Sequence, residues 1–403
     1  MSNQLEAEKR NHRKLGKELE LFTSMEEAPG MPFFLPNGMV IRNELENLWR
    51  KKHQKANYQE IKTPIMMKQE LWEQSGHWHH YQDNMYFSNV DEQNYAIKPM
   101  SCPGAILIFN SKRRSYRELP IRFGELGLVH RHELSGSING LLRVRSFTQD
   151  DAHLFVRIDQ IESEIDKVLT LIDEFYAHFG FEYKVELSTR PEDYMGSKEI
   201  WNKAELALES VLKSKGFDYQ SNHGDGAFYG PKIDFHILDS LGRSWQCGTV
   251  QLDFQMPKKF DCTYVGEDGK LHRPVMIHRA IYGSVERFMA ILIEHYAGDF
   301  PLWLSPVQAK IIPISDSHVD YAVEVKSQLE LAGLRVEIDG RSEKMGFKIR
   351  DAEKQKIPYM IVIGDKEMES QSLALRKRKE GSLGVLSIQE TIERFIKEIN
   401  HIR

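Results

Sequence analysis

The sequence of 403 residues contains only three cysteines, Cys102, Cys247 and Cys262. Three cysteines cannot form a disulfide framework, and their spacing matches no structural zinc motif, so we expect a reducing compartment. No apolar run approaches the ~20 residues that a membrane-spanning helix requires. The mixed-charge N-terminus also lacks the apolar segment of a secretory signal. The sequence therefore predicts a cytoplasmic protein without membrane contact.

Basic charge and glycine-rich phosphate loops are lacking as well. The formal net charge is −5, which excludes a protein that coats nucleic acid non-specifically but is compatible with a local basic face for a structured RNA. Neither G-x-x-x-x-G-K-[ST] nor G-x-G-x-x-G occurs, so phosphate groups must be bound in another way. We interpret the short basic run at residues 344–348 as a surface turn.

The first three quarters of the chain predict an α+β domain with a mostly antiparallel sheet, because strands and helices do not alternate regularly. Strand-like patterns occur at residues 61–65, 121–129, 141–147, 233–237 and 245–254. Helical apolar spacing occurs at residues 5–20, 38–58, 159–179, 200–215 and 280–296, and Asp159 is the expected N-cap of the third of these helices.

The remainder of the chain has a different pattern. Strands are expected at residues 310–314, 335–338, 360–363 and 373–376, and helices at 319–331, 345–355 and 388–399. Regular alternation of this kind predicts a small α/β domain with a mostly parallel sheet. We place the two domains at residues 1–304 and 305–403.

Two segments carry the chemistry of a nucleotide site. In the first, Arg131 and Glu133 are separated by one residue, so on a strand both side chains share one face. A guanidinium can bind phosphate through two parallel hydrogen bonds, and a carboxylate can accept from an exocyclic amine. In the second, residues 283–287 (Gly-Ser-Val-Glu-Arg) place another arginine, Arg287, at the start of an apolar helix.

These segments, with residues 143–153 (RVRSFTQDDAH), resemble motifs 2 and 3 of the class II aminoacyl-tRNA synthetases. Residues 98–104 (KPMSCPG) and 276–280 (MIHRA) are similar to the threonyl-tRNA synthetase family in particular. The resemblance extends from about residue 7 to the C-terminus. It implies a class II catalytic domain followed by an α/β anticodon-binding domain. The helix, strand and proline at residues 38–65 resemble motif 1 and imply a homodimer.

The resemblance also implies a reaction, in which ATP and L-threonine give threonyl-adenylate and threonine then passes to tRNA(Thr), with Mg²⁺ accompanying ATP. Such chemistry depends on positioning and charge stabilisation more than on proton transfer. Bacterial members of the family carry an N-terminal editing domain that this chain lacks. The chain is either an excised piece or a naturally short form, and the sequence does not decide between them.

Specific site residues follow from the resemblance. Arg131 would bind the α-phosphate, Arg287 the γ-phosphate and Glu133 the adenine amine, and the remaining ATP-binding residues are Arg143, Phe147, Gln246 and Thr249. The predicted catalytic residues are Arg131, Arg287 and Lys232. The predicted threonine-binding residues are Met100, Gln149, Asp151, Tyr229, Lys232, Cys247, Gln251 and Ser284.

The predicted metal ligands are Cys102, His153 and His278. Taken singly, each is more often a packed core residue, and only the resemblance selects them. One thiolate, two imidazoles and an open coordination position are typical of a zinc ion that binds substrate. Threonine's amino and hydroxyl groups would complete the coordination, with Asp151 accepting from the hydroxyl. We interpret the histidine-rich run at residues 76–80 as an exposed aromatic and polar loop rather than a second metal site.

In the C-terminal domain, Glu367 and Arg376 align with the positions that read anticodon bases. Three alternatives remain at this point: a prolyl or seryl specificity, a non-catalytic synthetase paralogue, and a ligase that uses a carrier other than tRNA. The Cys/His/His trio disfavours the first, the retained motif arginines disfavour the second, and the C-terminal domain disfavours the third.

Overall fold

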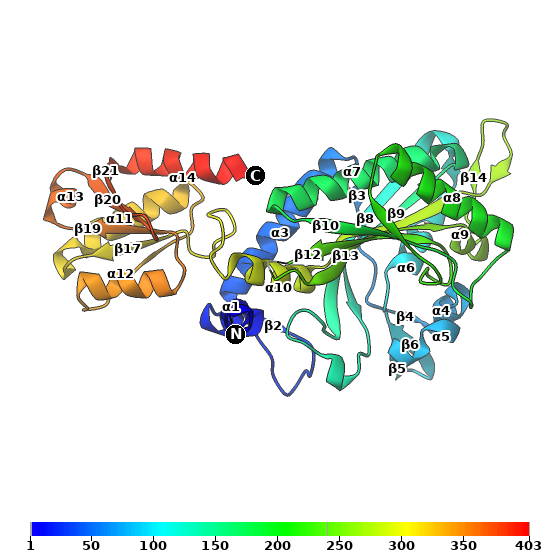
Figure 1. Cartoon of the computed structure of the whole chain (residues 1–403), viewed down its shortest axis with the longest axis horizontal. Helices are drawn as coiled ribbons and strands as arrows, with labels where there is room; N and C mark the ends of the chain where they lie inside the picture. The colour runs from blue at the N-terminus through cyan, green and yellow to red at the C-terminus, as the bar shows by residue number, and fades with distance from the viewer. Residues whose placement is uncertain (1, 240, 403) are drawn as a thin grey trace. The chain divides into compact units, whose positions relative to one another are not determined.

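The computed structural model describes residues 2–239 and 241–402, which fall into two units (Figure 1). The first unit consists of residues 26–32 and 49–290. The second consists of the residues up to 25, residues 33–48 and the residues from 291 onward. Helices α3 (Pro36–Lys55) and α10 (Val285–Tyr296) contribute residues to both units.

The first unit is organised around an eight-stranded sheet in the order β11-β10-β12-β13-β16-β9-β8-β3. Among the described strand pairs of this sheet, only the outermost two, β10–β11 and β3–β8, are parallel. This confirms the predicted α+β fold with a mostly antiparallel sheet. The strands are β3 (Gln59–Glu60), β8 (Ile121–His130), β9 (Ser146–Val156), β10 (Tyr183–Ser188), β11 (Tyr219–Asn222), β12 (Lys232–Leu238), β13 (Ser244–Asp253) and β16 (Val275–Ser284).

Helices α7 (Ile161–Phe179) and α8 (Lys198–Ser214) lie on one face of this sheet, and α6 (Cys102–Asn110) lies on the other (Figure 1). Helix α7 buries the apolar side chains that recur along one side of it, as its sequence predicts. Its predicted N-cap is wrong, because the helix begins after Gln160 and Asp159 pairs with Arg157 instead. Gly180, at a φ of 70°, ends the helix in the left-handed conformation.

Shorter elements complete this unit: β4 (Met66–Lys68), α4 (Gln69–Ser75), α5 (His77–His80), η1 (Gln82–Asn84), β5 (Tyr86–Val90), β6 (Gln93–Ile97), β7 (Arg114–Ser115), η2 (Tyr116–Glu118), η3 (Ser135–Ser137), η4 (Ile158–Gln160), α9 (Gln255–Lys259), β14 (Tyr264–Val265) and β15 (Leu271–His272). The expected strand at 61–65 is wrong, because the pairing with β8 ends at Glu60.

The second unit contains a five-stranded sheet in the order β18-β17-β19-β20-β21. Its first three strands are parallel, whereas β20 and β21 pair antiparallel, so the sheet is mixed rather than mostly parallel. The strands are β17 (Ala309–Pro313), β18 (Val336–Ile338), β19 (Tyr359–Ile363), β20 (Ser372–Lys377) and β21 (Gly381–Ser387). The helices are η5 (Asp316–His318), α11 (Val319–Leu331), α12 (Met345–Lys354), α13 (Asp365–Glu369) and α14 (Ile388–Ile402).

The same unit contains the N-terminal elements α1 (Ser2–Arg10), α2 (His12–Glu18), β1 (Phe22–Thr23) and β2 (Phe33–Phe34). The single helix expected at residues 5–20 is therefore two helices. They separate at Asn11, whose side-chain oxygen accepts from the Arg13 amide and caps α2. Across the described chain, no helix combines the length and apolar character needed to cross a membrane.

Candidate functional site

One cavity of about 390 Å³ in the first unit is lined by every predicted ATP-, threonine- and metal-binding residue except Lys232. Lys232 opposes Gln251, a residue of the cavity wall, in the β12–β13 ladder. Its Nζ lies 2.8 Å from Oδ2 of Asp234. The sheet thus gathers residues that are far apart in sequence, and Lys232 lies beside the cavity rather than on its wall.

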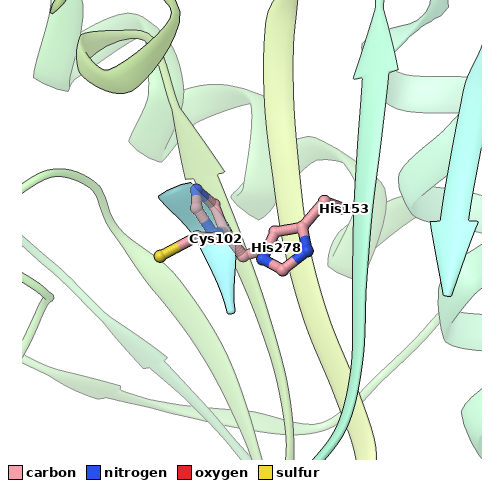
Figure 2. Close-up of side chains that lie close together, drawn as sticks. All are labelled: Cys102, His153 and His278. Carbon is pink, nitrogen blue, oxygen red and sulfur yellow. The ribbon is translucent and has the colours of Figure 1, made fainter. Parts of the chain in front are cut away.

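The three predicted metal ligands come from three elements. His153 and His278 oppose each other in the β9–β16 ladder, and Cys102 is the first residue of α6. Their potential ligand atoms all lie within 4.8 Å of one another, and all three residues are buried (Figure 2). Because strand side chains alternate between faces, Asp151 lies on the same face as His153.

The chemistry of these donors fits a zinc ion. Burial lowers the pKa of His153 well below its ordinary value, so its imidazole is neutral and able to bind a metal. Burial, together with Asp151 and Asp253, raises the pKa of Cys102. A thiol in such a place becomes a thiolate when a cation coordinates it. Two imidazoles and one such thiol form the donor set of a zinc site with an open position.

Two buried carboxylates adjoin these ligands. Nε2 of His278 lies 2.8 Å from Oδ2 of Asp253, a residue that the sequence analysis did not select. Burial, with the Glu125 and Asp150 carboxylates, raises the pKa of Asp151 to about 8. A divalent cation beside Asp151 would favour its charged form. The Asp253 contact leaves the other ring nitrogen of His278 for a metal, as outer-sphere carboxylates commonly do.

Three arginines, Arg131, Arg143 and Arg287, make part of the cavity wall cationic. The Arg287 guanidinium donates to the carbonyl oxygens of Leu142 (3.0 Å) and Gln246 (2.9 Å). Burial, and among its charged neighbours the cations Arg143 and Arg131, lowers the pKa of Arg287. Like charges held this close favour an anionic ligand, such as a polyphosphate.

Two contacts among the predicted ATP-binding residues are already made. The Arg131 guanidinium lies 5.1 Å from the centre of the Phe147 ring, a cation–π distance. Nε of Arg143 lies 3.0 Å from Oε2 of Glu133. Arg143 therefore pairs with the carboxylate of Glu133, which the resemblance predicts to bind the adenine amine.

Comparison with known proteins assigns the chain to a family. Residues 86–296 match the model of the tRNA synthetase class II core domain (G, H, P, S and T), and residues 308–398 match that of an anticodon binding domain. The chain is 41% identical to a crystal structure described as the RNA binding domain of threonyl-tRNA synthetase from Cryptosporidium parvum Iowa II, with a TM-score of 0.94. That match covers 96% of this chain and 98% of the other. This chain belongs to the threonyl-tRNA synthetase family.

Bacterial relatives agree with the assignment. The chain is 62% identical over 396 residues to a threonine--tRNA ligase of Acetivibrio thermocellus and 61% identical over 398 residues to one of Carboxydothermus hydrogenoformans. These matches cover 98% and 99% of this chain but 62% and 63% of the relatives, so the chain spans less than two thirds of their length.

His77 lies next to the lining residues Met100 and Cys102, and its environment differs from the one that the sequence predicts. It begins the short helix α5 and is fully buried, so the interpretation of its run as an exposed loop is wrong at this position. Its Nε2 lies 3.9 Å from Sγ of Cys102 and 3.2 Å from Sδ of Met100. Its Nδ1 lies 2.7 Å from Oγ of Ser75. His77 therefore packs against Cys102, one of the predicted metal ligands of this synthetase-family chain.

The predicted anticodon residues lie in the second unit. Oε2 of Glu367 accepts from the Gly364 amide (3.0 Å) at the start of α13. Arg376 lies on β20, against which α13 packs. The basic run at 344–348 is only partly a surface turn, because Lys348 is buried and its Nζ donates to the carbonyl oxygens of Pro313 and Asp339.

Proposed function

We propose that the chain carries the catalytic and anticodon-binding parts of a threonine--tRNA ligase. ATP and L-threonine give threonyl-adenylate and pyrophosphate, and threonine is then transferred to the terminal ribose hydroxyl of tRNA(Thr). The observation that supports this most strongly is a single cavity that joins the Cys102, His153 and His278 donors to the arginines Arg131 and Arg287.

In the activation step, the threonine carboxylate attacks the α-phosphorus of ATP, and the bond to pyrophosphate breaks. The attacking group is already a nucleophile, so the protein contributes alignment and stabilisation of charge. Arg131 binds the α-phosphate and Arg287 the γ-phosphate, and both guanidiniums act without moving a proton. Mg²⁺ enters with ATP and neutralises phosphate charge.

Amino-acid selection belongs to the other part of the cavity. Cys102, His153 and His278 would hold one zinc ion, which, when bound, supplies coordination positions for threonine's amino and hydroxyl groups. Asp151 accepts a hydrogen bond from that hydroxyl. A site that must bind a hydroxyl rejects an analogue lacking it by ~10⁴–10⁵, whereas an apolar pocket separates such isosteres by only ~10². Valine is thereby excluded.

The finer assignments follow from the same proposal. The catalytic domain is residues 1–304 and the anticodon-binding domain residues 305–403, the latter supported by the anticodon binding domain match at residues 308–398. Glu367 and Arg376 contact anticodon bases of tRNA(Thr), since single-stranded loop bases are read by hydrogen bonds and stacking. The protein acts in the cytoplasm as a homodimer.

The decisive experiment combines metal analysis with amino-acid-dependent ATP–pyrophosphate exchange. Wild-type protein should contain about one zinc ion per chain and respond to threonine but not to proline or valine. Cys102→Ser should remove both zinc and the threonine response. Cys262→Ser is the matched control, because Cys262 is equally buried but lies outside the cavity. A zinc-free wild type, or exchange indifferent to amino acids, would contradict the proposal.

A further inference from the structure

Strand β16 departs from its partner β9 just before it reaches the arginine part of the cavity. Three residues of β16, residues 281–283, face a single residue of β9, Asp150, because the ladder resumes only at Ser284. Extra residues on one strand form a bulge, which bends the strand and redirects the residues that follow. In this chain the residues that follow are those that begin α10.

The carboxylate of Asp150 binds the amides of the bulge. Oδ2 lies 2.9 Å from the Ile281 amide nitrogen, and Oδ1 lies 2.9 Å from that of Gly283. The Tyr282 amide also donates to this carboxylate. Buried backbone amides require acceptors, and a bulge removes the strand carbonyls that normally provide them. Asp150, fully buried, supplies charged acceptors in their place.

Other buried groups fix the rest of the bulge. The hydroxyl of Tyr176 on α7 donates to the Ile281 carbonyl oxygen at 2.7 Å. Gly283 has a φ of 77°, and a Cβ atom there would lie 2.5 Å from the Cys247 carbonyl oxygen. Contacts to the bulge amides, to the Ile281 carbonyl oxygen and at Gly283 therefore restrict the bulge to one conformation.

The bulge sets the position of Arg287, because it directly precedes the start of α10. Ser284, the first residue after it, accepts from the Arg287 amide through Oγ (3.2 Å) and so caps the start of α10. The Arg287 side chain then donates to the Leu142 and Gln246 carbonyl oxygens, and all three residues line the cavity. A change in the course of residues 281–283 would displace this guanidinium directly.

We propose that Asp150 is a positioning residue for the nucleotide: it fixes the bulge that sets where Arg287 meets the γ-phosphate. This inference rests on the proposed function, in which Arg287 binds ATP. Asp150 itself is not among the described residues that line the cavity. Because strand side chains alternate, it lies on the face opposite Asp151 and His153, so it acts through the residues that the bulge positions, chiefly Arg287.

Asp239 provides a matched control. It is also a buried aspartate that caps backbone, since Oδ1 accepts from the Leu241 and Arg243 amides at 2.9 Å. It lies in the β12–β13 turn and does not line the cavity. Asp239→Asn thus removes a buried carboxylate that accepts from backbone amides, and it leaves the bulge unchanged.

The test measures MgATP affinity by titration calorimetry on the full chain, beside the KM for threonine in exchange and the zinc content. Asp150→Asn replaces two acceptor oxygens by one and turns an N–H donor toward the bulge amides. The Kd for MgATP should rise about tenfold, the scale of one lost charge-assisted hydrogen bond. The threonine KM should rise less than the Kd for MgATP, because Ser284 is the one predicted threonine-binding residue that follows the bulge, and zinc should be retained. Asp239→Asn should lower the Tm while leaving MgATP affinity unchanged.

A double-mutant cycle separates positioning from general destabilisation. In an Arg287→Ala background, Asp150→Asn should weaken MgATP binding no further, because the residue through which it acts is gone. An equal effect in both backgrounds, or unchanged affinity in folded Asp150→Asn, would overturn the inference. If Asp150→Asn does not fold, Tyr176→Phe takes its place, with about a threefold rise in Kd expected and the same cycle applied. A wild type that binds MgATP but shows no threonine-dependent exchange would reject the proposed function and still leave Asp150 to be judged.

Discussion

Nε2 of His278 lies 2.8 Å from Oδ2 of Asp253, and the carboxylate of Asp253 is completely buried. The other oxygen of Asp253 accepts from the Gln255 and Met256 amides at 2.7 and 3.1 Å. The backbone at the start of α9 thus orients a carboxylate, and the carboxylate orients an imidazole. Such a contact fixes both the ring plane and the nitrogen that carries the proton.

Asp253→Asn should therefore weaken zinc binding about 10–100-fold, since outer-sphere partners of ligating histidines have effects of that size. The measurement is competition for zinc with a chromogenic chelator, and it does not depend on activity. MgATP affinity should be unchanged, because Arg131 and Arg287 do not contact Asp253. Unchanged zinc affinity would mean that Asp253 only caps α9.

The ion pair between Arg122 and Glu164 predicts a pH-dependent loss of stability. It is bidentate, with distances of 2.6 and 2.8 Å. Burial alone would raise the pKa of Glu164, but hydrogen bonds and charges from Arg122 and Lys167 outweigh burial and lower it below 4.5. Arg122→Ala should lower the free energy of unfolding at pH 7 by about 2–3 kcal/mol, less than the ~3–5 kcal/mol for a fully buried pair, because Lys167 remains.

The sign of the pH effect follows from the lowered pKa. A carboxyl group with a lower pKa in the folded state contributes stability above its unfolded pKa, and the contribution disappears as the pH falls through the folded pKa. The difference between Arg122→Ala and wild type, measured by denaturant unfolding, should thus shrink below about pH 4. A difference that stays constant from pH 7 to pH 3 would contradict this account.

Gly283→Ala should destabilise the protein and weaken ATP binding together. A left-handed residue with a Cβ costs about 1–2 kcal/mol, and here the Cβ would also collide with the Cys247 carbonyl oxygen. Gly180→Ala is the control, because Gly180 has a φ of 70° but open space around its Cβ position. Thermal unfolding should show the larger loss for Gly283→Ala, and only this variant should raise the Kd for MgATP.

Serine should be activated to a measurable extent. It keeps the amino and hydroxyl groups that the zinc would bind and lacks one methyl group, which is worth about 10–200-fold. The ratio of kcat/KM for threonine over serine in ATP–pyrophosphate exchange should fall in that range. A ratio above about 10⁴ would require a contact to the methyl group that an apolar pocket does not provide.

Amphipathic helices were the most predictable elements, because their period is local. Helix α11 has the predicted bounds of residues 319–331. Helix α10 was expected from residue 280 but begins at Val285, since residues 280–284 belong to β16. A buried strand and a buried helix both appear as continuous apolar runs, and only pairing with the neighbouring strands β9 and β13 separates them.

The site was predictable only as far as the resemblance reached. Cys102, His153 and His278 are brought together by strand pairing and by α6, which no local spacing encodes, and their metal-binding role stays a prediction. Asp253 carries no motif, because its role depends on a strand register. His77 lies in a run of polar and aromatic residues whose composition indicates a surface, yet tertiary packing buries it.

The bulge at residues 281–283 lies between a residue of the predicted amino-acid site and a residue of the predicted nucleotide site. His278 precedes it on β16 and Arg287 follows it on α10, so in the proposed function this segment serves amino-acid binding at one end and nucleotide binding at the other. Because side chains alternate with a period of two, sliding β16 by one residue would turn His278 away from the cavity and would shift the start of α10, which carries Arg287. An insertion or deletion between residues 278 and 287 should therefore impair both proposed roles at once, whereas an exchange of one side chain should affect only one of them.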